Sequence, residues 1–471
     1  MKKLSVGTKV CYATGNLGYG VISQTITTFI MFYGTSVLGI KGSLVGLCVA
    51  LSTFWDGLSD PIIGYLSDRT QSKFWGRRLG FLFFGTLLMV VSNILLWNVP
   101  NAFNEIGKFI WLLTFLLIIE TANTCFATPY VALGIDIAPG YNEQSILQAY
   151  KTVSFIIGMI LPSVLMILFF PNKDNSLAQL NNVGYIKMSY VTSAIALVCG
   201  FICILGTFKK VNSMPKYNAR KKEKNAFFKI FYNFFKNLKK KNYGSIIISY
   251  SIALISAAFL TSVGMHLFTY CFHFNSVQIP ILMTSIFLGA IISQPVWIYL
   301  SKKIDKKPTL NYSFFAILIG IFLTFWIFLF RQDIGSEICF FILLICLFIC
   351  GFGTGALYTL PISMLADNVT IDKLRTGEDK SGVYSGYMTL AYNISNSIAL
   401  LVIGVLLDLI KFDSSLPVQP LKVQNWLGII VFGGCAISIV LAIIILSNYK
   451  LKRSDILKQR LLAKRRNENN K

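Results

Sequence analysis

Apolar residues along the chain gather into twelve long runs that are separated by shorter polar stretches. Each run has few charges and reaches the length of about 20 residues that an α-helix needs to cross a bilayer. The runs are expected at 11–39, 43–67, 79–99, 109–135, 148–170, 186–208, 244–272, 280–300, 309–330, 337–366, 381–409 and 424–449. The pattern predicts an all-α membrane protein of twelve transmembrane helices with both termini on one side.

Composition agrees with this pattern of apolar runs. Of the 471 residues, 55% are hydrophobic and only 13% are charged. Soluble domains carry about 25% charged residues, so a soluble fold would lack the charged surface that keeps it in water. The abundance of Phe, Leu and Ile also excludes a disordered chain.

The charge of the chain is strongly positive and unevenly placed. Lys and Arg number 43 against 20 Asp and Glu, a formal net charge of +23. The basic stretches all fall on one face of the predicted topology, at 1–9, 69–78, 209–241, 302–307 and 450–471. The positive-inside rule assigns this face to the cytoplasm and explains the charge without nucleic acid as a partner. We expect a multi-pass protein of the cytoplasmic (plasma) membrane, in contact with membrane lipid, with both termini cytoplasmic.

The longest basic stretch separates two sets of six spans. We expect an N-terminal six-helix bundle at 1–208, a basic cytoplasmic linker at 209–243, a C-terminal six-helix bundle at 244–449 and a basic cytoplasmic tail at 450–471. The linker lies near anionic lipid, and its aromatic pairs alternating with Lys indicate a short interfacial helix, with a partner-binding motif as the alternative.

An internal repeat supports this division. Four residues recur with a constant offset of 234: Pro61, Tyr65, Leu66 and Ser67 return as Pro295, Tyr299, Leu300 and Ser301. Such a repeat at the same place in each half is typical of pseudo-symmetric transporters. The repeat breaks at the acids, because Gln294 corresponds to Asp60 and Ala290 to Asp56.

Motifs for catalysis, nucleotide binding and zinc coordination are absent from the sequence. There is no phosphate-binding G-x-x-x-x-G-K-S/T loop and no nucleophile elbow, so we expect neither an enzyme nor an ATP-driven pump. All ten cysteines lie in apolar segments, where they are expected to be small buried hydrophobic residues rather than metal ligands.

Two carboxylates lie inside a predicted span. Asp56 and Asp60 are four residues apart, so they share one helix face. A carboxylate in hydrocarbon normally faces a cavity or a partner. A bound proton or a monovalent cation such as Na⁺ would relieve the repulsion within the pair. The alternative is a structural pair held by Lys or Arg of a neighbouring helix. No cofactor and no other metal are expected.

Further polar side chains within the spans are candidates for contact with a substrate. Lys151 opens the fifth span, where it either snorkels to the interface or brings a positive charge to a central cavity. The other candidates come from spans one, four and eleven: Asn16, Tyr19, Tyr130, Tyr392 and Asn393. They combine aromatic faces with hydrogen-bonding groups, as polar substrates require. Ordinary hydrogen bonding between helices is the alternative. Glu120 is one more inward-facing candidate, whereas His266 is expected to be packed or interfacial, with a place facing the cavity as the alternative.

Three segments together resemble one family of secondary transporters. They are WDGLSDPIIGYLSDRTQSKFWGRR at 55–78, TPYVALGIDIAPGYNEQSILQAYK at 128–151 and LPISMLADNVTIDKLRTGEDKSGVYSG at 360–386. With them the chain, from about residue 7 to residue 455, resembles the glycoside–pentoside–hexuronide:cation symporter family, the melibiose permease-like branch of the major facilitator superfamily. The resemblance implies two pseudo-symmetric six-helix bundles that work by alternating access, and symport of a sugar with Na⁺, Li⁺ or H⁺.

The resemblance also implies roles for particular residues. Asp56 and Asp60 match the family's cation-site acids, and Thr124 falls where a cation-site Thr is expected. Lys151 falls where the family often has a cavity Arg. Charged residues in or beside the matching segments are expected to gate or clamp loops: Asp68, Arg69, Arg77, Arg78, Asp367 and Arg375.

The family's sugar-binding residues are replaced in this chain. Gly20 and Ala127 stand where two acids are usual, and Val131 stands at the place of a stacking Trp. Tyr392 or Asn393 replaces the usual Lys of span eleven. We expect a secondary active symporter that couples Na⁺ or H⁺ to a small-molecule substrate, in the first place a sugar or glycoside. The replacements leave open a lysophospholipid or other amphiphile carrier of the same fold, or a non-transporting membrane sensor.

Overall fold

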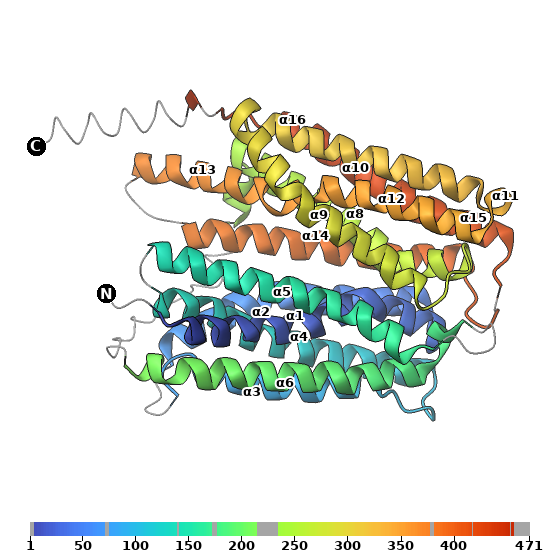
Figure 1. The fold of residues 1–471 in the computed structure, drawn as a ribbon, viewed down its shortest axis with the longest axis horizontal. Coiled ribbons are helices and arrows are strands. Elements are labelled where there is room, and N and C mark those ends of the chain that lie inside the picture. Colours follow the sequence, from blue (N-terminus) through green and yellow to red (C-terminus); the bar gives the residue numbers. More distant parts are fainter. Residues whose placement is uncertain are drawn as a thin grey trace, which may run out of the picture. The chain divides into compact units, whose positions relative to one another are not determined.

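The computed structural model describes residues 4–70, 75–138, 141–171, 177–213, 234–376, 381–416, 418–452 and 454–455, apart from the side chains of 141–142, 145, 373–376, 381–383 and 385. These parts of the chain are almost entirely helical (Figure 1). The predicted all-α fold is therefore confirmed. Most of the predicted linker, at 214–233, and most of the predicted tail, at 456–471, lie outside the described residues.

The chain forms two compact units. Unit 1 comprises Met1–Lys224, Thr261–Pro280 and Leu400–Val423. Its principal helices are α1 (Val6–Phe32), α2 (Gly42–Arg69), α3 (Leu79–Trp97), α4 (Glu105–Ile137), α5 (Tyr141–Phe169) and α6 (Asn182–Asn212), and a π-helical turn (Tyr33–Val37) continues α1. The last turns of α8 and α14 also belong to this unit.

Unit 2 comprises Asn225–Leu260, Ile281–Ala399 and Gln424–Lys471. Its helices are α8 (Lys241–Tyr270), α9 (Gln278–Ile304), α10 (Lys306–Leu329), α11 (Arg331–Ile334), α12 (Ser336–Gly355), α13 (Leu360–Thr376), α14 (Ser381–Leu409), α15 (Leu421–Gly428) and α16 (Gly434–Ser447). The run predicted as one span at 337–366 contains a break, because a 3-10 turn (Ala356–Tyr358) separates α12 from α13.

Helix length and hydropathy agree with the predicted spans. Eleven helical stretches in the described part are long and apolar enough to cross a membrane. The remaining predicted span is α1, which has 27 residues. Its buried polar side chains, among them Asn16 and Thr25, lower its hydropathy.

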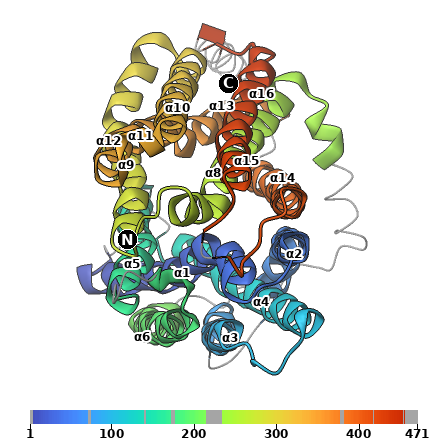
Figure 2. The ribbon, with the colours of Figure 1, turned by 90° about the vertical axis from the view of Figure 1, so that its right-hand side faces the viewer.

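Small residues bring the helices of unit 1 close together. An atom added at the Cβ of Gly158 on α5 would lie 2.7 Å from the backbone oxygen of Leu17 on α1. An atom added at the Cβ of Gly85 on α3 would lie 2.9 Å from the backbone nitrogen of Phe126 on α4. Close backbone contacts of this kind are the usual packing mode of helices within a bilayer. Figure 2 shows α3 between α4 and α6, with both of which it packs.

Candidate functional site

The acidic pair of α2 lies against a hydroxyl-bearing face of α4. The Oγ1 of Thr124 donates a hydrogen bond of 3.0 Å to Oδ1 of Asp56. The Oγ of Ser59 lies 2.9 Å from the same Thr124 oxygen. The structure therefore brings together Asp56 and Thr124, two of the residues predicted to bind a cation.

The second acid of the pair has a hydroxyl partner that sequence reasoning missed. The Oγ1 of Thr128 donates a hydrogen bond of 2.8 Å to Oδ1 of Asp60. Thr128 follows Thr124 by four residues, as Asp60 follows Asp56, so two successive turns of α2 face two successive turns of α4. The sequence shows this matching spacing, but only the packing of α2 against α4 places Thr128 beside Asp60.

A third carboxylate lies on the same side of unit 1. Glu120 precedes Thr124 by one turn, and its Oε2 accepts a hydrogen bond of 3.1 Å from Asn123. Tyr19 of α1 lies within electrostatic range of Glu120 and of both acids of α2. All three carboxylates are only partly buried. Carboxylate and hydroxyl oxygens are ligands for hard cations such as Na⁺, and the carboxylates can also take up protons.

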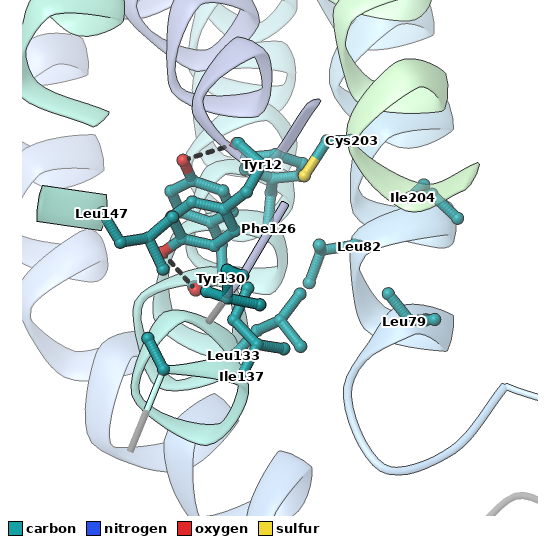
Figure 3. Close-up of a cluster of buried hydrophobic side chains, with 12 residues drawn as sticks. Tyr12, Leu79, Leu82, Phe126, Tyr130, Leu133, Ile137, Leu147, Cys203 and Ile204 are labelled. Carbon is teal, nitrogen blue, oxygen red and sulfur yellow. Dashed lines mark hydrogen bonds between the residues drawn. The ribbon is translucent and has the colours of Figure 1, made fainter. Parts of the chain in front are cut away.

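An aromatic pair supports the site from within the core of unit 1. The rings of Tyr12 and Tyr130 stack at 4.4 Å between centroids, with 8° between their planes. The hydroxyl of Tyr12 donates to the backbone oxygen of Tyr130 at 3.0 Å, and the hydroxyl of Tyr130 donates to the backbone oxygen of Tyr12 at 2.9 Å. Figure 3 shows both bonds and the surrounding apolar side chains. Tyr130, a predicted substrate contact, is only 1% exposed and belongs to the buried core of unit 1.

The predicted substrate residues of α1 and α5 lie around this aromatic pair. The Nζ of Lys151 lies 5.6 Å from the centroid of the Tyr130 ring, within the range of a cation–π interaction. The side-chain amide of Asn16 donates a hydrogen bond of 3.2 Å to the backbone oxygen of Lys151. One turn further along α5, the ring of Phe155 stacks at 6.2 Å on that of Tyr19. Asn16, Tyr19, Tyr130 and Lys151 thus form one group on α1, α4 and α5.

The two predicted substrate residues of α14 belong to unit 2. Asn393 is 4% exposed, and Tyr392 is half-buried. His266, by contrast, lies in unit 1, fully buried, 2.7 Å from the Oγ1 of Thr35. Its ring packs edge-on against the rings of Phe32 and Phe412, so His266 is part of the packing between helices near their ends.

The charges predicted to clamp the loop after α2 meet at Asp136, at the end of α4. Asp136 accepts hydrogen bonds from Arg77 at 2.9 Å and from Arg78 at 2.6 Å. Arg78 also pairs with Asp68 at 3.1 Å, and the Arg69 guanidinium stacks over the Tyr65 ring at 3.4 Å. The clamp therefore joins the end of α2, the start of α3 and the end of α4. Sequence reasoning did not identify Asp136.

Unit 2 contains a corresponding ion pair. Lys306, at the start of α10, pairs with Asp367 of α13. Asp367 was predicted to have a gating or clamping role, whereas Lys306 was seen only as part of a basic loop. The side chain of Arg375, predicted for the same role, lies outside the described side chains.

Comparison with known proteins assigns the chain to a class of transporters. Residues 11–453 match the model of a family described as MFS/sugar transport protein, and the chain belongs to this family. The protein is thus a multi-pass membrane transporter of the major facilitator superfamily, as predicted, and its class is that of a carrier rather than an enzyme.

Individual relatives extend this comparison. The sodium-dependent lysophosphatidylcholine symporter 1 of Gallus gallus is 23% identical, over 91% of this chain and 84% of that protein. The sphingosine-1-phosphate transporter MFSD2B of Xenopus tropicalis is 25% identical, over 95% of this chain and 89% of that protein. Among solved structures, a D-xylose-proton symporter shares the fold with a TM-score of 0.67 at 12% identity, covering 95% of this chain and 98% of that one.

Proposed function

We propose that this protein is a cation-coupled carrier of a lysophospholipid or a similar amphiphile with a charged head group. It would work in the cytoplasmic membrane with both termini in the cytoplasm, as the basic loops indicate. The proposed substrate is thus an amphiphile and not the sugar that the sequence resemblance implies. Coupling to Na⁺ or H⁺ remains part of the proposal. So does membership of the melibiose permease-like branch of the superfamily.

One contact of unit 1 carries the preference for an amphiphile. The resemblance places a sugar-gripping acid at Gly20, but an atom added at the Cβ of Gly20 would lie 3.0 Å from Cδ2 of Phe155. An aromatic ring therefore lies against the position at which the resemblance expects a carboxylate. By the same resemblance, Ala127 stands in place of a second acid, and Val131 in place of a Trp that stacks on the sugar. Without these groups the hydroxyls of a sugar would lose their hydrogen-bonding partners, which a specific site cannot tolerate.

The remaining polar groups suit a charged head group on an apolar chain. Lys151 supplies a partly buried ammonium to a phosphate, and Glu120 supplies a carboxylate to a quaternary or primary amine. Val131 and Ile135 of α4 are 41% and 51% exposed, so an apolar surface follows Tyr130 along the same helix. Relatives named for lysophosphatidylcholine and sphingosine-1-phosphate support the same class of substrate.

Coupling follows from the charge of the acidic pair. A cation at Asp56 and Asp60, with the hydroxyls of Thr124 and Thr128 beside them, would offset the repulsion between the carboxylates and draw α2 toward α4. If this arrangement binds substrate more tightly, substrate must raise the affinity for the cation by the same factor.

Uptake into proteoliposomes tests the proposal. Purified full-length protein would receive labelled lysophosphatidylcholine, lysophosphatidylethanolamine or a panel of pentosides and hexosides, under an imposed Na⁺ or H⁺ gradient. Albumin extraction separates lysolipid left in the outer leaflet from lysolipid that has crossed. The variants are Asp60→Asn, Lys151→Ala and the matched control Glu337→Gln, which changes an exposed acid of α12.

The expected result is gradient-driven movement of lysolipid that Asp60→Asn abolishes, Lys151→Ala weakens and Glu337→Gln leaves intact. Movement of lysolipid that ignores both gradients would refute the coupling. Accumulation of a sugar without movement of lysolipid would return the assignment to sugar symport. Movement of neither by folded protein would favour the sensor.

A further inference from the structure

The acidic site of unit 1 has an uncharged counterpart in unit 2. Asp60 of α2 accepts a hydrogen bond from Thr128 of α4 at 2.8 Å. Gln294 of α9, its counterpart in the sequence repeat, accepts one through Oε1 from Thr359 at 2.6 Å. Thr359 lies at the junction between α12 and α13. The repeat thus extends from the sequence to the hydrogen bonds of the side chains.

A serine hydroxyl lies in the same place beside each of the two positions. Ser59 donates to the backbone oxygen of Asp56 at 3.1 Å, and Ser293 donates to that of Ala290 at 3.0 Å. Both serines directly precede the residues in question, Asp60 and Gln294. The backbones of α2 and α9 therefore present these side chains in the same way.

The two side chains differ in what they can donate. The Nε2 of Gln294 donates a hydrogen bond of 2.8 Å to the backbone oxygen of Gly355, at the end of α12. A carboxylate has no hydrogen with which to do this. The amide nitrogen of Gln294, with its partial positive charge, thus joins α9 to a carbonyl oxygen of α12. In a carboxylate site this bridging position would need a proton or a cation.

The backbone contact around this bridge leaves little space. An atom added at the Cβ of Gly355 would lie 2.6 Å from the backbone oxygen of Ala290 and would also meet the Oγ of Ser293. In unit 1 the side chain of Thr124 lies against Asp56. In unit 2 the backbones of α9 and α12 therefore lie in close contact. In unit 1 the hydroxyl-bearing side chain of Thr124 lies between α2 and α4.

We infer that the amide nitrogen of Gln294 takes the place of a bridging cation in unit 2 and holds α9 to α12 whether or not a cation is bound in unit 1. Gln294 is then a positioning residue that joins α9 to the α12–α13 junction at any cation concentration. The part of this inference that concerns unit 1 rests on the proposed function of Asp56 and Asp60.

The test compares Gln294→Glu, Gln294→Ala and the control Gln332→Glu, which adds the same charge at an exposed position of α11. Thermal unfolding of the purified full-length protein is measured across NaCl concentrations, with choline chloride keeping the ionic strength constant. In Gln294→Glu, Na⁺ is expected to raise the Tm by several degrees more than in wild type, because it bridges the new carboxylate to Gly355. Gln294→Ala should lower the Tm equally at all Na⁺ concentrations. Its transport should show a reduced Vmax with the half-saturating Na⁺ unchanged within twofold.

Two results would overturn the inference. One is a Na⁺-dependent rise in the Tm of Gln294→Glu no larger than that of wild type and Gln332→Glu. The other is a half-saturating Na⁺ concentration for transport by Gln294→Ala that differs severalfold from that of wild type. If Gln294→Glu does not fold, this second measurement is the test of the inference. The double variant Asp60→Asn/Gln294→Glu separates the two proposals. This double variant should still show the Na⁺-dependent rise in Tm, because that rise depends on the new carboxylate at position 294 and not on cation binding at Asp60.

Discussion

Asp408, at the end of α14, caps the first turn of α2 at Gly42. Its Oδ1 accepts a hydrogen bond from the Gly42 amide at 2.6 Å, and its Oδ2 accepts one from the Ser43 amide at 2.9 Å. The first amides of a helix lack partners within the helix and carry a partial positive charge, so a carboxylate there stabilises it. Close packing supports the cap, since an atom added at the Cβ of Gly46 would lie 2.8 Å from the backbone oxygen of Leu400. Asp408 therefore fixes the start of the helix that carries both candidate cation-binding acids.

Removal of this cap should destabilise unit 1. Asp408→Ala leaves two amides of α2 without an acceptor and is expected to cost about 1–2 kcal/mol, the usual effect of losing a helix cap. Asp408→Asn keeps one acceptor oxygen and should cost less. Thermal unfolding of the purified protein measures both changes, with Asp333→Ala as the control because Asp333 is exposed. An Asp408→Ala variant with the Tm of wild type would contradict the role of the cap.

The hydroxyl of Thr128 should tune the affinity for the coupling cation. Thr128→Val keeps the shape of the side chain but removes the hydrogen bond to Asp60, and hydrogen bonds to charged groups contribute about 1.5–3 kcal/mol. We expect the half-saturating concentration of the cation to rise about tenfold, which corresponds to about 1.4 kcal/mol. Thr128→Ser retains the hydroxyl and should restore a value near that of wild type. Initial rates of uptake at a series of Na⁺ concentrations check this, and equal values for the Val and Ser variants would refute it.

Local signals in the sequence were enough for the spans and for half of the acidic site. Helix length and hydropathy depend on residues close together in the chain, and the four-residue spacing of Asp56 and Asp60 fixes their common face. Their partners on α4 lie 68 positions away. The resemblance supplied Thr124, whereas Thr128 was missed because no local pattern shows which turn of α4 faces Asp60.

Longer-range contacts were beyond the reach of such signals. Asp136 and Asp408 look like ordinary charges at the ends of apolar runs, and only the packing of helices shows the groups that they bind. The burial of Tyr130 likewise follows from its stacking on Tyr12, 118 positions earlier. The break after α12 went unnoticed because Gly355 and its neighbours continue the apolar run, although the helix ends there.

The stacked tyrosines should contribute measurably to stability. Tyr12→Phe keeps the ring stack but leaves the buried backbone oxygen of Tyr130 without this donor, which is expected to cost about 1 kcal/mol. Tyr130→Phe has the same effect on the backbone oxygen of Tyr12. Tyr190→Phe on α6 is the matched control, since Tyr190 is 51% exposed and should tolerate the change. Thermal unfolding ranks the three variants, and an equal Tm for all of them would show that the two hydrogen bonds contribute nothing.

The two neighbouring arginines of the clamp should differ in importance. The side chain of Arg78 is 7% exposed and binds both Asp68 and Asp136, whereas that of Arg77, which also binds Asp136, is 22% exposed. Breaking a fully buried ion pair costs about 3–5 kcal/mol. Because Asp136 and Asp68 remain 30% and 54% exposed, we expect a smaller loss for Arg78→Ala, on the order of 2 kcal/mol.

Arg77→Ala should cost less than about 1 kcal/mol, and that loss should shrink further in concentrated salt, which screens exposed pairs. Arg78→Lys should not restore stability, since a single ammonium cannot reproduce the forked contacts of a guanidinium with two carboxylates. Thermal unfolding at low and high ionic strength distinguishes the two arginines. If Arg77→Ala and Arg78→Ala lowered the Tm equally at both ionic strengths, burial would not be what sets the strength of this clamp.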